Sequence, residues 1–333
     1  MKRAGDLFYA IIDFDNLLEA FHKAQLGKAD REGVKIFRAG LNDNIASLRS
    51  AIIDDTLVLG NYRYFTVHDP KTRLICAADF PERVVHHALI NVIGTFLERR
   101  MIYHSYACRK GKGQHQALET ARCFSRNHRF YLKTDIKKCF DSIPHTGLMS
   151  MLSRLFKDCR LLLLCKKIID SYHVEPGHGL PIGNLTSQYF ANAYLDIFDH
   201  WIEERCRVMC YLRYMDDMLV FGEKNDLVVI REKCKDYLVS ELGLSLNKGG
   251  MINRTEAGVG FLGRTVFPNG IRLSKRTKKR VRTKFHRYET MWDKGYWDSA
   301  TLQRRMESLW AGMKTSNSLG WRRRLAERAC NDV

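Results

Sequence analysis

The stretch Arg213-Tyr214-Met215-Asp216-Asp217-Met218-Leu219-Val220-Phe221 places two adjacent acids between two apolar runs. Apolar runs on either side of a short polar step predict a β-hairpin with buried strands, whose turn is Met215-Asp216-Asp217. Asp is a common turn residue, so the pair is compatible with a solvated loop or with a site that grips a divalent cation. The rest of the chain has to distinguish these two interpretations.

Composition bounds the class of protein. The length of 333 residues allows one large domain or two to three small ones, and 45% hydrophobic with 28% charged residues is typical of a soluble globular protein. No run of 18 apolar residues is present, so neither a transmembrane helix nor a membrane partner is expected. Asp13 and Asp15 interrupt what would be the apolar part of a signal peptide. Ten cysteines without regular spacing then indicate a reducing, cytoplasmic location, and Cys206 and Cys210 have no second pair with which to bind zinc.

The charge balance is the most informative part of the composition. A net charge of +18 and a pI near 9.5 indicate an anionic partner, most commonly a nucleic-acid backbone. Residues 272–287 hold nine Lys or Arg and no acid, with Val281, Phe285, Tyr288 and Trp292 at helical spacing. This pattern predicts an amphipathic helix with one apolar seam, and a second helix at 302–313 would complete a small helical domain. The cations are either a solvated face or contacts to a nucleic-acid backbone, and the second is favoured because a run without acids serves solubility poorly. They are Lys275, Arg276, Lys278, Lys279, Arg280, Arg282 and Lys284.

The remaining elements alternate between helices and short strands. Residues 14–25 predict a helix with one apolar face behind Asp15 or Asn16 as its N-cap. Two β runs separated by Asp69-Pro70-Lys71 predict a hairpin over residues 62–76. A buried strand is predicted at 129–136. The other expected elements are helices at 43–53, 80–99, 146–172 and 225–242, a helix that ends near 206, and strands within 258–273.

A third acid, Asp135, makes the hairpin a candidate metal-binding site. Asp135 lies at the end of the predicted strand 129–136, and if this strand neighbours the hairpin, Asp135, Asp216 and Asp217 converge at one edge of a sheet. Three carboxylates at close quarters repel one another unless cations neutralise them, and oxygen-only ligation favours Mg²⁺ or Mn²⁺. Two such ions can hold both the attacking and the leaving oxygen of a phosphoryl displacement. The acids therefore predict nucleotidyl transfer.

With these residues in place, the chain resembles the reverse transcriptases. The resemblance rests on Tyr214-Met215-Asp216-Asp217 in its apolar hairpin, with Asp135 and Phe140 five residues apart, and it covers roughly residues 55–290. The further motifs, in the expected order, are Arg73 to Asp79, Arg83 to Leu89, Gly179 to Gln188, Gly243 to Lys248 and Gly260 to Gly263. The resemblance implies an α+β right-hand polymerase. Its parts would be an N-terminal helical extension at 1–54, fingers at 55–128 and 146–180, a palm at 129–145 and 181–268, and a helical basic thumb at 269–333.

Carried over position by position, the resemblance assigns roles to single residues. Asp135, Asp216 and Asp217 would bind two Mg²⁺ ions, with Mn²⁺ as a substitute and the carbonyl of Ile136 as a further ligand. Phe140 would form an aromatic wall against a ribose 2′-hydroxyl, so that deoxynucleotides are preferred; a plain core residue is the alternative. The other expected nucleotide contacts are Arg73 and Lys71 to the triphosphate, Lys248 to the pyrophosphate (or a surface lysine instead), and Ile182, Gly183 and Gln188.

Residues 182–188, Ile-Gly-Asn-Leu-Thr-Ser-Gln, narrow the resemblance further. Retroviral and group II intron enzymes usually carry Gln before the glycine and Ser-Pro at the end. An apolar residue before Gly183 and a final Ser-Gln are similar to reverse transcriptases of diversity-generating retroelements. Tyr106 to Arg109, with Gly111, Gly113 and His115, fits the same subgroup. Because Ile182 cannot make the hydrogen bond of a Gln, and a lost contact of ~1 kcal/mol is several-fold in discrimination, low fidelity is expected.

The resemblance thus implies an error-prone, RNA-templated DNA polymerase that copies a template-repeat RNA into cDNA with errors at adenines, for targeted diversification by mutagenic retrohoming. Its partners would be the template RNA, a primer or cDNA strand and dNTPs, in a bacterial or phage-host cytosol. Because the chain ends just after the thumb, a small basic oligomeric accessory protein is expected as well. Retron, group II intron-like and phage-defence reverse transcriptases share the metal site and remain alternatives. A non-catalytic RNA-binding scaffold is a third, although a scaffold has no need for clustered acids facing an anionic ligand.

Overall fold

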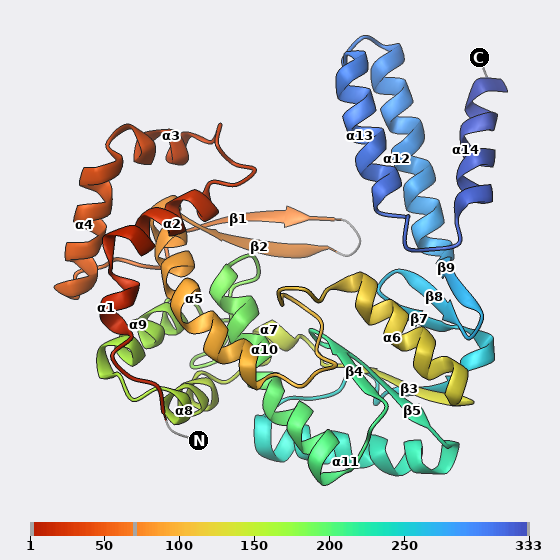
Figure 1. Ribbon diagram of the computed structural model, residues 1–333, viewed down its shortest axis with the longest axis horizontal. Helices are drawn as coiled ribbons and strands as arrows, with labels where there is room; N and C mark the ends of the chain where they lie inside the picture. The colour runs from red at the N-terminus through yellow and green to blue at the C-terminus, as the bar shows by residue number, and fades with distance from the viewer. Residues whose placement is uncertain (1–2, 69–71, 332–333) are drawn as a thin grey trace. The chain divides into compact units, whose positions relative to one another are not determined.

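The computed structural model describes residues 3–68 and 72–331, and the chain divides into two compact units, which are described separately (Figure 1). Unit 1 consists of Met1–Cys108, Ile136–Arg207 and Lys233–Lys248. Unit 2 consists of Arg109–Asp135, Val208–Glu232 and Gly249–Val333.

The N-terminal part of unit 1 is helical. Its helices are α1 (Phe8–Ile11), α2 (Phe14–Ala24), α3 (Glu32–Ala39), α4 (Leu41–Ile53) and α5 (Phe80–Arg100). Phe21, Phe37 and Phe80 come from three of these helices and pack together with ring centroids 5.4 to 5.9 Å apart. The predicted N-cap of α2 was wrong by two or three residues. Asp13 is the cap, and its carboxylate accepts the backbone N–H groups of Asp15 and Asn16 at 3.1 and 3.4 Å.

Unit 1 also contains the predicted two-stranded hairpin. Strands β1 (Tyr62–Val67) and β2 (Arg73–Ala78) pair antiparallel, from Tyr62 opposite Ala78 to Val67 opposite Arg73. The hairpin prediction is confirmed, and its turn Asp69-Pro70-Lys71 lies outside the described residues.

The single helix predicted at 146–172 is two helices, α8 (His145–Leu155) and α9 (Cys159–Asp170). Asp158 separates them, because its carboxylate accepts the N–H groups of Arg160 and Leu161, each at 3.1 Å, and so caps α9. Its second oxygen accepts the N–H groups of Leu7 and Phe8 at 3.0 and 2.9 Å. The rest of this part of unit 1 comprises α7 (Cys139–Ser142), α10 (Leu185–His200) and a π-helical turn, Trp201–Arg205.

Unit 2 is built on an antiparallel four-stranded sheet in the order β4-β5-β3-β6. The strands are β3 (Phe130–Asp135), β4 (Tyr211–Tyr214), β5 (Asp217–Gly222) and β6 (Met251–Arg254). Helix α6 (Gln114–Asn127) packs on this sheet, and its Phe124 ring lies 5.7 Å from that of Phe221 (Figure 1). Tyr131, Leu132, Leu219 and Val220 are buried in the sheet. The pairing of β4, β5 and β3 confirms the predicted hairpin and its neighbouring strand. Their continuous apolar runs are explained by burial of the strands on both faces of the sheet.

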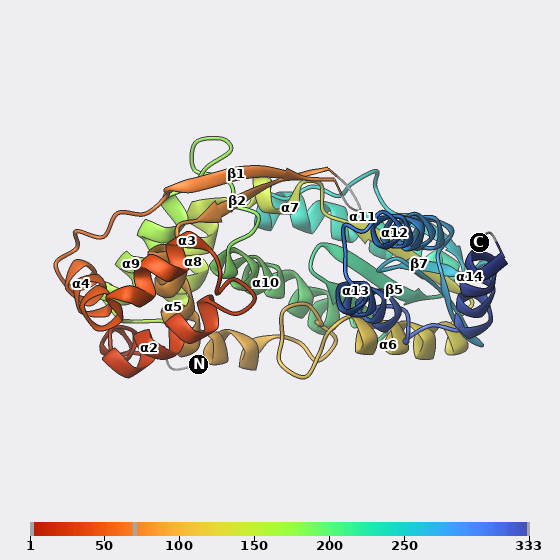
Figure 2. The same cartoon turned by 90° about the horizontal axis from the view of Figure 1, so that it is seen from above.

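The C-terminal part of unit 2 holds a small sheet and three helices. Its elements are β7 (Val259–Phe261), β8 (Arg264–Phe267), β9 (Gly270–Leu273), α12 (Lys275–Asp293), α13 (Ser299–Ala311) and α14 (Leu319–Asn331). Helices α12 and α13 lie side by side in both ribbon views (Figures 1 and 2). Val281 and Phe285 are buried with Met313 in a local core, whereas Trp292 is 47% exposed. The amphipathic helix is confirmed, but its apolar seam stops before Trp292.

Helix α11 (Lys224–Leu242) follows β5 and completes the set of long helices. Within the described ranges, 3–68 and 72–331, none of the helices combines the length and the apolar character needed to cross a bilayer.

Candidate catalytic site

The β4–β5 hairpin turns on two residues. Tyr214 pairs with Asp217, so only Met215 and Asp216 lie between the strands. The predicted three-residue turn was wrong in this respect, because Asp217 is the first residue of β5. Two-residue hairpin loops require a positive φ at their first position, and Met215 has a φ of 54°. A side chain in this conformation costs on the order of 1–3 kcal/mol, so the surrounding structure must hold the turn, and with it Asp216.

Two of the three acids face each other in the sheet. Strands β3 and β5 pair with Asp135 directly opposite Asp217. Residues in such a pair project to the same face, with Cβ atoms about 4.5–5.5 Å apart. Both side chains are half-buried, and half-buried Asp216 precedes Asp217 at the turn. The structure therefore brings the three predicted acids to one end of the sheet in unit 2.

Arg213 supports the turn from within unit 2. It interrupts the apolar run of β4, its side chain is fully buried, and its Nη1 donates to the carbonyl oxygen of Met215 at 3.1 Å. This hydrogen bond restrains the peptide that leads into Asp216. In the sequence, Arg213 is visible only as a break in the apolar run of β4. A charged residue among apolar neighbours must find partners inside the protein, and that was the available signal.

Lys133 is a second residue that sequence analysis missed. Its Nζ lies 3.7 Å from Oδ1 of Asp217 and donates to the carbonyl oxygen of Gly260 at 2.7 Å. The signal was strand periodicity, since Lys133 and Asp135 are two residues apart and project from the same face of β3. Lys133 therefore offsets part of the negative charge of the acids.

We expect Lys133→Met to make folding stability more dependent on Mg²⁺. A partly exposed ion pair is worth roughly 0.5 kcal/mol, and ~1 kcal/mol shifts Tm by about 2–4 °C for 150–250 residues and by less for a longer chain. The variant should melt about 1 °C below the wild type in EDTA, and the gap should narrow in saturating Mg²⁺ because the ion replaces the lost charge. Thermal melts of the variant and of Lys224→Met, an exposed control on α11, check this. A deficit of the same size with and without Mg²⁺ would argue against the assigned role.

The three acids are better suited to an open magnesium site than to a site that encloses a metal ion. They offer only carboxylate oxygens, which suit Mg²⁺ or Mn²⁺ rather than zinc. Among the residues the structure describes, no three His, Cys, Asp or Glu side chains are gathered closely enough to enclose an ion. Mg²⁺ usually keeps several waters and takes one or two protein carboxylates together with substrate phosphates, and an open carboxylate edge is compatible with this mode of binding. Asp135, Asp216 and Asp217 are the side chains that would hold it.

In unit 1, β2 carries Arg73 at its start, and the segment of Ile182 and Gly183 contacts the same strand at Ile75 and Cys76. Arg73 is exposed at the first position of this strand, and Cys76 donates its N–H to the carbonyl oxygen of Ile182 at 2.8 Å. Gly183 has a φ of +123°, and a Cβ there would lie 2.8 Å from Cγ2 of Ile75. Only glycine fits this close approach, so Gly183 docks the segment on the strand.

Phe140 and Gln188 also belong to unit 1. The carbonyl oxygen of half-buried Phe140 accepts the N–H of Leu180 at 2.7 Å, which ties α7 to the segment before α10. Gln188 is half-buried on α10, and its Oε1 accepts a hydrogen bond from the Cys108 thiol at 3.2 Å. Phe140 is thus not a fully buried core residue.

Ile136 and Lys248 lie near each other in the backbone of unit 1. Buried Ile136 forms an isolated β-bridge with Leu246, and the N–H of Lys137 donates to the carbonyl oxygen of Ser245 at 2.8 Å. Lys248, two residues beyond the bridge, is exposed with a φ of 53°. Lys71 is outside the described residues.

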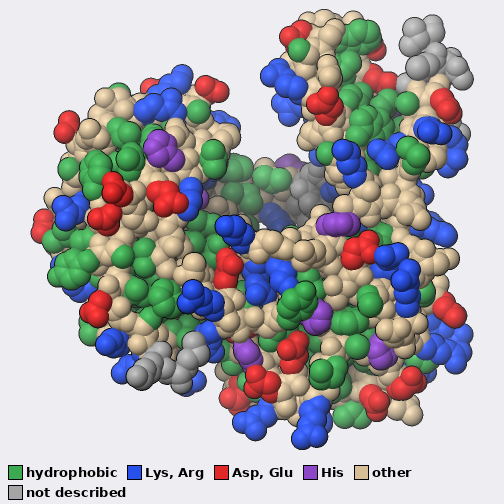
Figure 3. Space-filling view, in the orientation of Figure 1, with side chains coloured by type: hydrophobic (Ala, Val, Ile, Leu, Met, Phe, Trp, Pro, Cys, Tyr) green, Lys and Arg blue, Asp and Glu red, His purple; other side chains and the backbone are tan. Residues whose placement is uncertain are grey.

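The seven basic residues predicted to contact nucleic acid all lie on α12. Four are exposed, namely Lys275, Arg276, Lys279 and Arg282. Lys278, Arg280 and Lys284 are half-buried. On the face of the C-terminal helices seen in Figure 3, Lys and Arg side chains are interspersed with hydrophobic and acidic ones. The exposed cations are therefore the ones available to a phosphate backbone.

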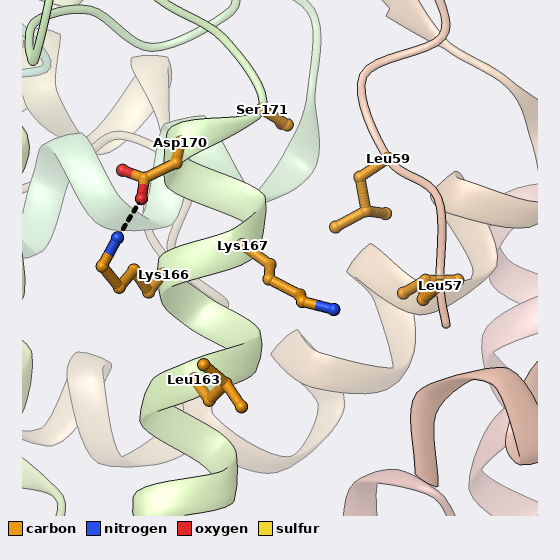
Figure 4. A pocket seen from close by; sticks show the side chains of 7 residues that line it. All are labelled: Leu57, Leu59, Leu163, Lys166, Lys167, Asp170 and Ser171. Atoms are coloured by element: carbon orange, nitrogen blue, oxygen red, sulfur yellow. Dashed lines mark hydrogen bonds and ion pairs between the residues drawn. The ribbon is translucent and has the colours of Figure 1, made fainter. Parts of the chain in front are cut away.

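A pocket of about 400 Å³ in unit 1 does not contain any of these residues (Figure 4). Its lining is Leu57, Leu59, Leu163, Lys166, Lys167, Asp170 and Ser171. Lys166 is paired with Asp170, and Nζ of Lys167 lies 2.6 Å from the carboxylate of Asp55. Because its cations are paired within the protein, this pocket has little charge to offer an anionic ligand.

Residues 68–266 match the family model described as reverse transcriptase (RNA-dependent DNA polymerase). The match covers more than half of the chain and includes all three acids. The chain belongs to the reverse transcriptase family. The enzyme class that the resemblance implied, an RNA-directed DNA polymerase, is confirmed.

Among its relatives is protein YkfC of Escherichia coli K12, which is 25% identical in an alignment 263 residues long; the match covers 62% of this chain and 69% of YkfC. The putative COX1/OXI3 intron 1 protein of Saccharomyces cerevisiae is 23% identical in an alignment 265 residues long; the match covers 61% of this chain and 32% of that protein. The group II intron-encoded protein LtrA of Lactococcus lactis is 25% identical over 138 residues, or 40% of this chain and 23% of LtrA. The chain thus spans a third or less of these two intron proteins.

The structure is similar to that of telomerase from Candida albicans, with a TM-score of 0.50 and 13% identity, over 67% of this chain and 50% of that one. At this identity the likeness concerns the fold alone. Together with the family match, it confirms the predicted α+β polymerase fold.

Proposed function

We propose that this chain extends a primer or cDNA strand on an RNA template by Mg²⁺-dependent nucleotidyl transfer. The observation that carries the proposal is the register of unit 2, which sets Asp135 opposite Asp217 next to a turn that presents Asp216. Ions held there supply charge stabilisation for a phosphoryl displacement. The acids orient them, and Arg213 and Lys133 restrain the turn and the neighbouring charge. Incorporation of dNTPs on an RNA template in the presence of Mg²⁺ is the direct test.

The residues of unit 1 receive nucleotide-binding roles in this proposal. Arg73, exposed at the start of β2, contacts the triphosphate, together with Lys71. Phe140 blocks a ribose 2′-hydroxyl, and Lys248 protonates the pyrophosphate. Residues 55–128 and 146–180 act as fingers, 129–145 and 181–268 as palm, and 269–333 as a thumb that holds the duplex through α12. Support for these roles comes from the order of the motifs and from the exposure of the cations.

Within the family, we propose the diversity-generating retroelement type, in which adenines of a template-repeat RNA are copied with errors. The supporting residue is Ile182, which stands where a Gln would donate a hydrogen bond near the nucleotide. Its backbone is fixed through Cys76, so the difference between Ile and Gln falls on the side chain. A small basic oligomeric accessory protein and a bacterial or phage-host cytosol belong to the same proposal.

Ile182→Gln should lower misincorporation opposite template adenine. A restored hydrogen bond of ~1 kcal/mol corresponds to about a five-fold gain in discrimination. The ratio of wrong to right incorporation opposite adenine, measured with single dNTPs on an RNA template, checks this. Ile182→Leu, which keeps the apolar character, is the matched control and should leave the ratio unchanged. An unchanged ratio in Ile182→Gln would show that the side chain at position 182 does not determine fidelity.

A group II intron-like reverse transcriptase is the second candidate, and the names of the yeast and Lactococcus relatives favour it. The flanking DNA separates the two. A pair of near-identical repeats that differ only at adenines supports the diversity-generating type, whereas intron boundaries around the coding region support the other.

A further inference from the structure

A second pocket in unit 1, of about 200 Å³, is polar and lies where the segment after α2, helix α5 and the start of α10 come together. The residues that matter for its chemistry are Lys28, Arg83, His86, His87, Asn184 and Gln188. In the 400 Å³ pocket the lysines are paired with acids. The described lining residues of this second pocket include no Asp or Glu.

The pocket concentrates positive charge. Partial burial and the charge of Arg83 lower the pKa of Lys28, and burial lowers the pKa of Arg83. Burial and the nearby cations lower the pKa of His87 to about 4, so His87 is neutral at physiological pH. Arg83 disfavours the charged state of Lys28, so the two cations form a local excess of positive charge that a bound anion would relieve. The neighbouring acid Glu82 accepts the N–H of Gly60 at 3.0 Å through Oε2, and its Oε1 lies 3.5 Å from Nε2 of His86.

Helix α10 opens at the same pocket. Its first residue, Leu185, is part of the lining, and the side chain of its N-cap, Asn184, does not cap it. The first N–H groups of a helix have no partner within the helix and carry the positive end of its dipole. The start of a 16-residue helix therefore adds backbone donors to the two cations.

Asn184 supplies an independent sign of a missing ligand. Its side chain is 2% exposed, and its Oδ1 accepts the N–H of Ala78 at 3.4 Å, which directs Nδ2 the other way. Within the described part of the chain, Nδ2 has no hydrogen-bond partner, nor do the ring nitrogens of His86, which is 1% exposed. An unsatisfied buried donor costs about 1–3 kcal/mol, and an acceptor oxygen in the pocket would remove this cost.

We propose that this pocket binds a phosphate group. Its volume is below the roughly 300–1,000 Å³ of sites for drug-sized ligands, so it accommodates a phosphate rather than a whole nucleotide. The ligand oxygens are bound by Lys28, Arg83, Asn184 Nδ2 and the start of α10. The phosphate comes either from the backbone of a nucleic-acid strand or from free phosphate in solution. The pocket includes Gly183 and Gln188, which the resemblance assigns to nucleotide contacts, so the inference rests on the proposed function for its biological role, while phosphate binding itself is measured without polymerase activity.

Calorimetric titration of inorganic phosphate into the full-length protein tests the proposal. The titration is made at constant ionic strength, without metal ion or dNTP, so a failure of polymerase activity does not affect it. We expect one saturable site, and a roughly 10-fold weaker Kd in Lys28→Gln, which corresponds to ~1.4 kcal/mol. Lys35→Gln removes an equal charge from an exposed position of α3 and should change the Kd by less than two-fold. Absence of saturable binding, or equal weakening in both variants, overturns the proposal.

Asn184→Asp provides a second variant of nearly identical shape that replaces the donor by a negative charge. Phosphate should raise the Tm of the wild type and leave the Tm of Asn184→Asp unchanged. A phosphate-induced rise of the same size in both proteins contradicts the site.

The source of the phosphate is decided by binding of a short single-stranded RNA to the same proteins. If a backbone phosphate occupies the pocket, Lys28→Gln weakens RNA binding more than Lys35→Gln does, and inorganic phosphate competes with the RNA. If free phosphate is the ligand, the two variants bind the RNA equally while only Lys28→Gln loses phosphate.

Discussion

Asp216→Asn is expected to lower the rate of nucleotide incorporation by at least about 1,000-fold while the protein still folds and binds a primer–template duplex. Asn keeps the shape of the side chain but removes its charge, so an ion at the turn loses a ligand. Metal ions contribute several kcal/mol of charge stabilisation, and ~4 kcal/mol corresponds to about three orders of magnitude in rate. Single-turnover incorporation of one dNTP on an RNA template measures the effect.

The matched control is Asp236→Asn, which changes an exposed acid on α11 in the same way. Its incorporation rate should equal that of the wild type. A retained rate in Asp216→Asn would leave the acids without a catalytic role and would favour the RNA-binding scaffold. Duplex binding and Tm, measured on the same samples, separate a catalytic loss from misfolding.

Removal of three exposed cations from α12 should weaken binding of the primer–template duplex strongly. Lys275, Lys279 and Arg282 are exposed on this helix, and we expect the triple substitution to Gln to reduce the salt dependence of binding. Each phosphate contact contributes about 0.9 to the slope of log K against log salt, so the slope should fall by up to about 2.7. If all three make contact, affinity near 0.1 M salt falls roughly 500-fold.

The control for this triple variant removes the same charge from another helix. Lys224, Lys233 and Lys235 are exposed on α11, and their replacement by Gln should change the slope by less than one contact. Equal losses in the two triple variants would show that net charge, rather than α12, determines duplex binding. Fluorescence anisotropy over a series of salt concentrations gives both slopes.

Local sequence patterns predicted the parts of the fold that local interactions determine. The hairpin around Asp216 and the cationic helix α12 follow from apolar periodicity, which is visible in a short window. The break between α8 and α9 does not, because the capping carboxylate of Asp158 also binds the backbone of Leu7 and Phe8, far away in the sequence. The boundaries that were missed are therefore those set by tertiary hydrogen bonds.

The same distinction applies to the candidate site. The convergence of Asp135, Asp216 and Asp217 was predicted on the assumption that two buried strands are neighbours, and the sheet confirms that assumption. The contact of Lys133 with Asp217 and the support of the turn by Arg213 depend on side-chain directions and burial, which one sequence does not specify. Lys133 and Arg213 are both cations near the acids. Positive charge there reduces the repulsion between the neighbouring carboxylates.

The most direct test of the proposed two-metal site is incorporation of a single dNTP by the wild-type protein on a DNA primer annealed to an RNA template, measured against Mg²⁺ concentration. We expect incorporation that is abolished by EDTA, restored by Mg²⁺ or Mn²⁺, and steeper than first order in metal at low concentrations, as the proposed two-ion mechanism requires. Metal-independent incorporation, or none by protein that binds the duplex with metal present, would contradict a two-metal site at Asp135, Asp216 and Asp217.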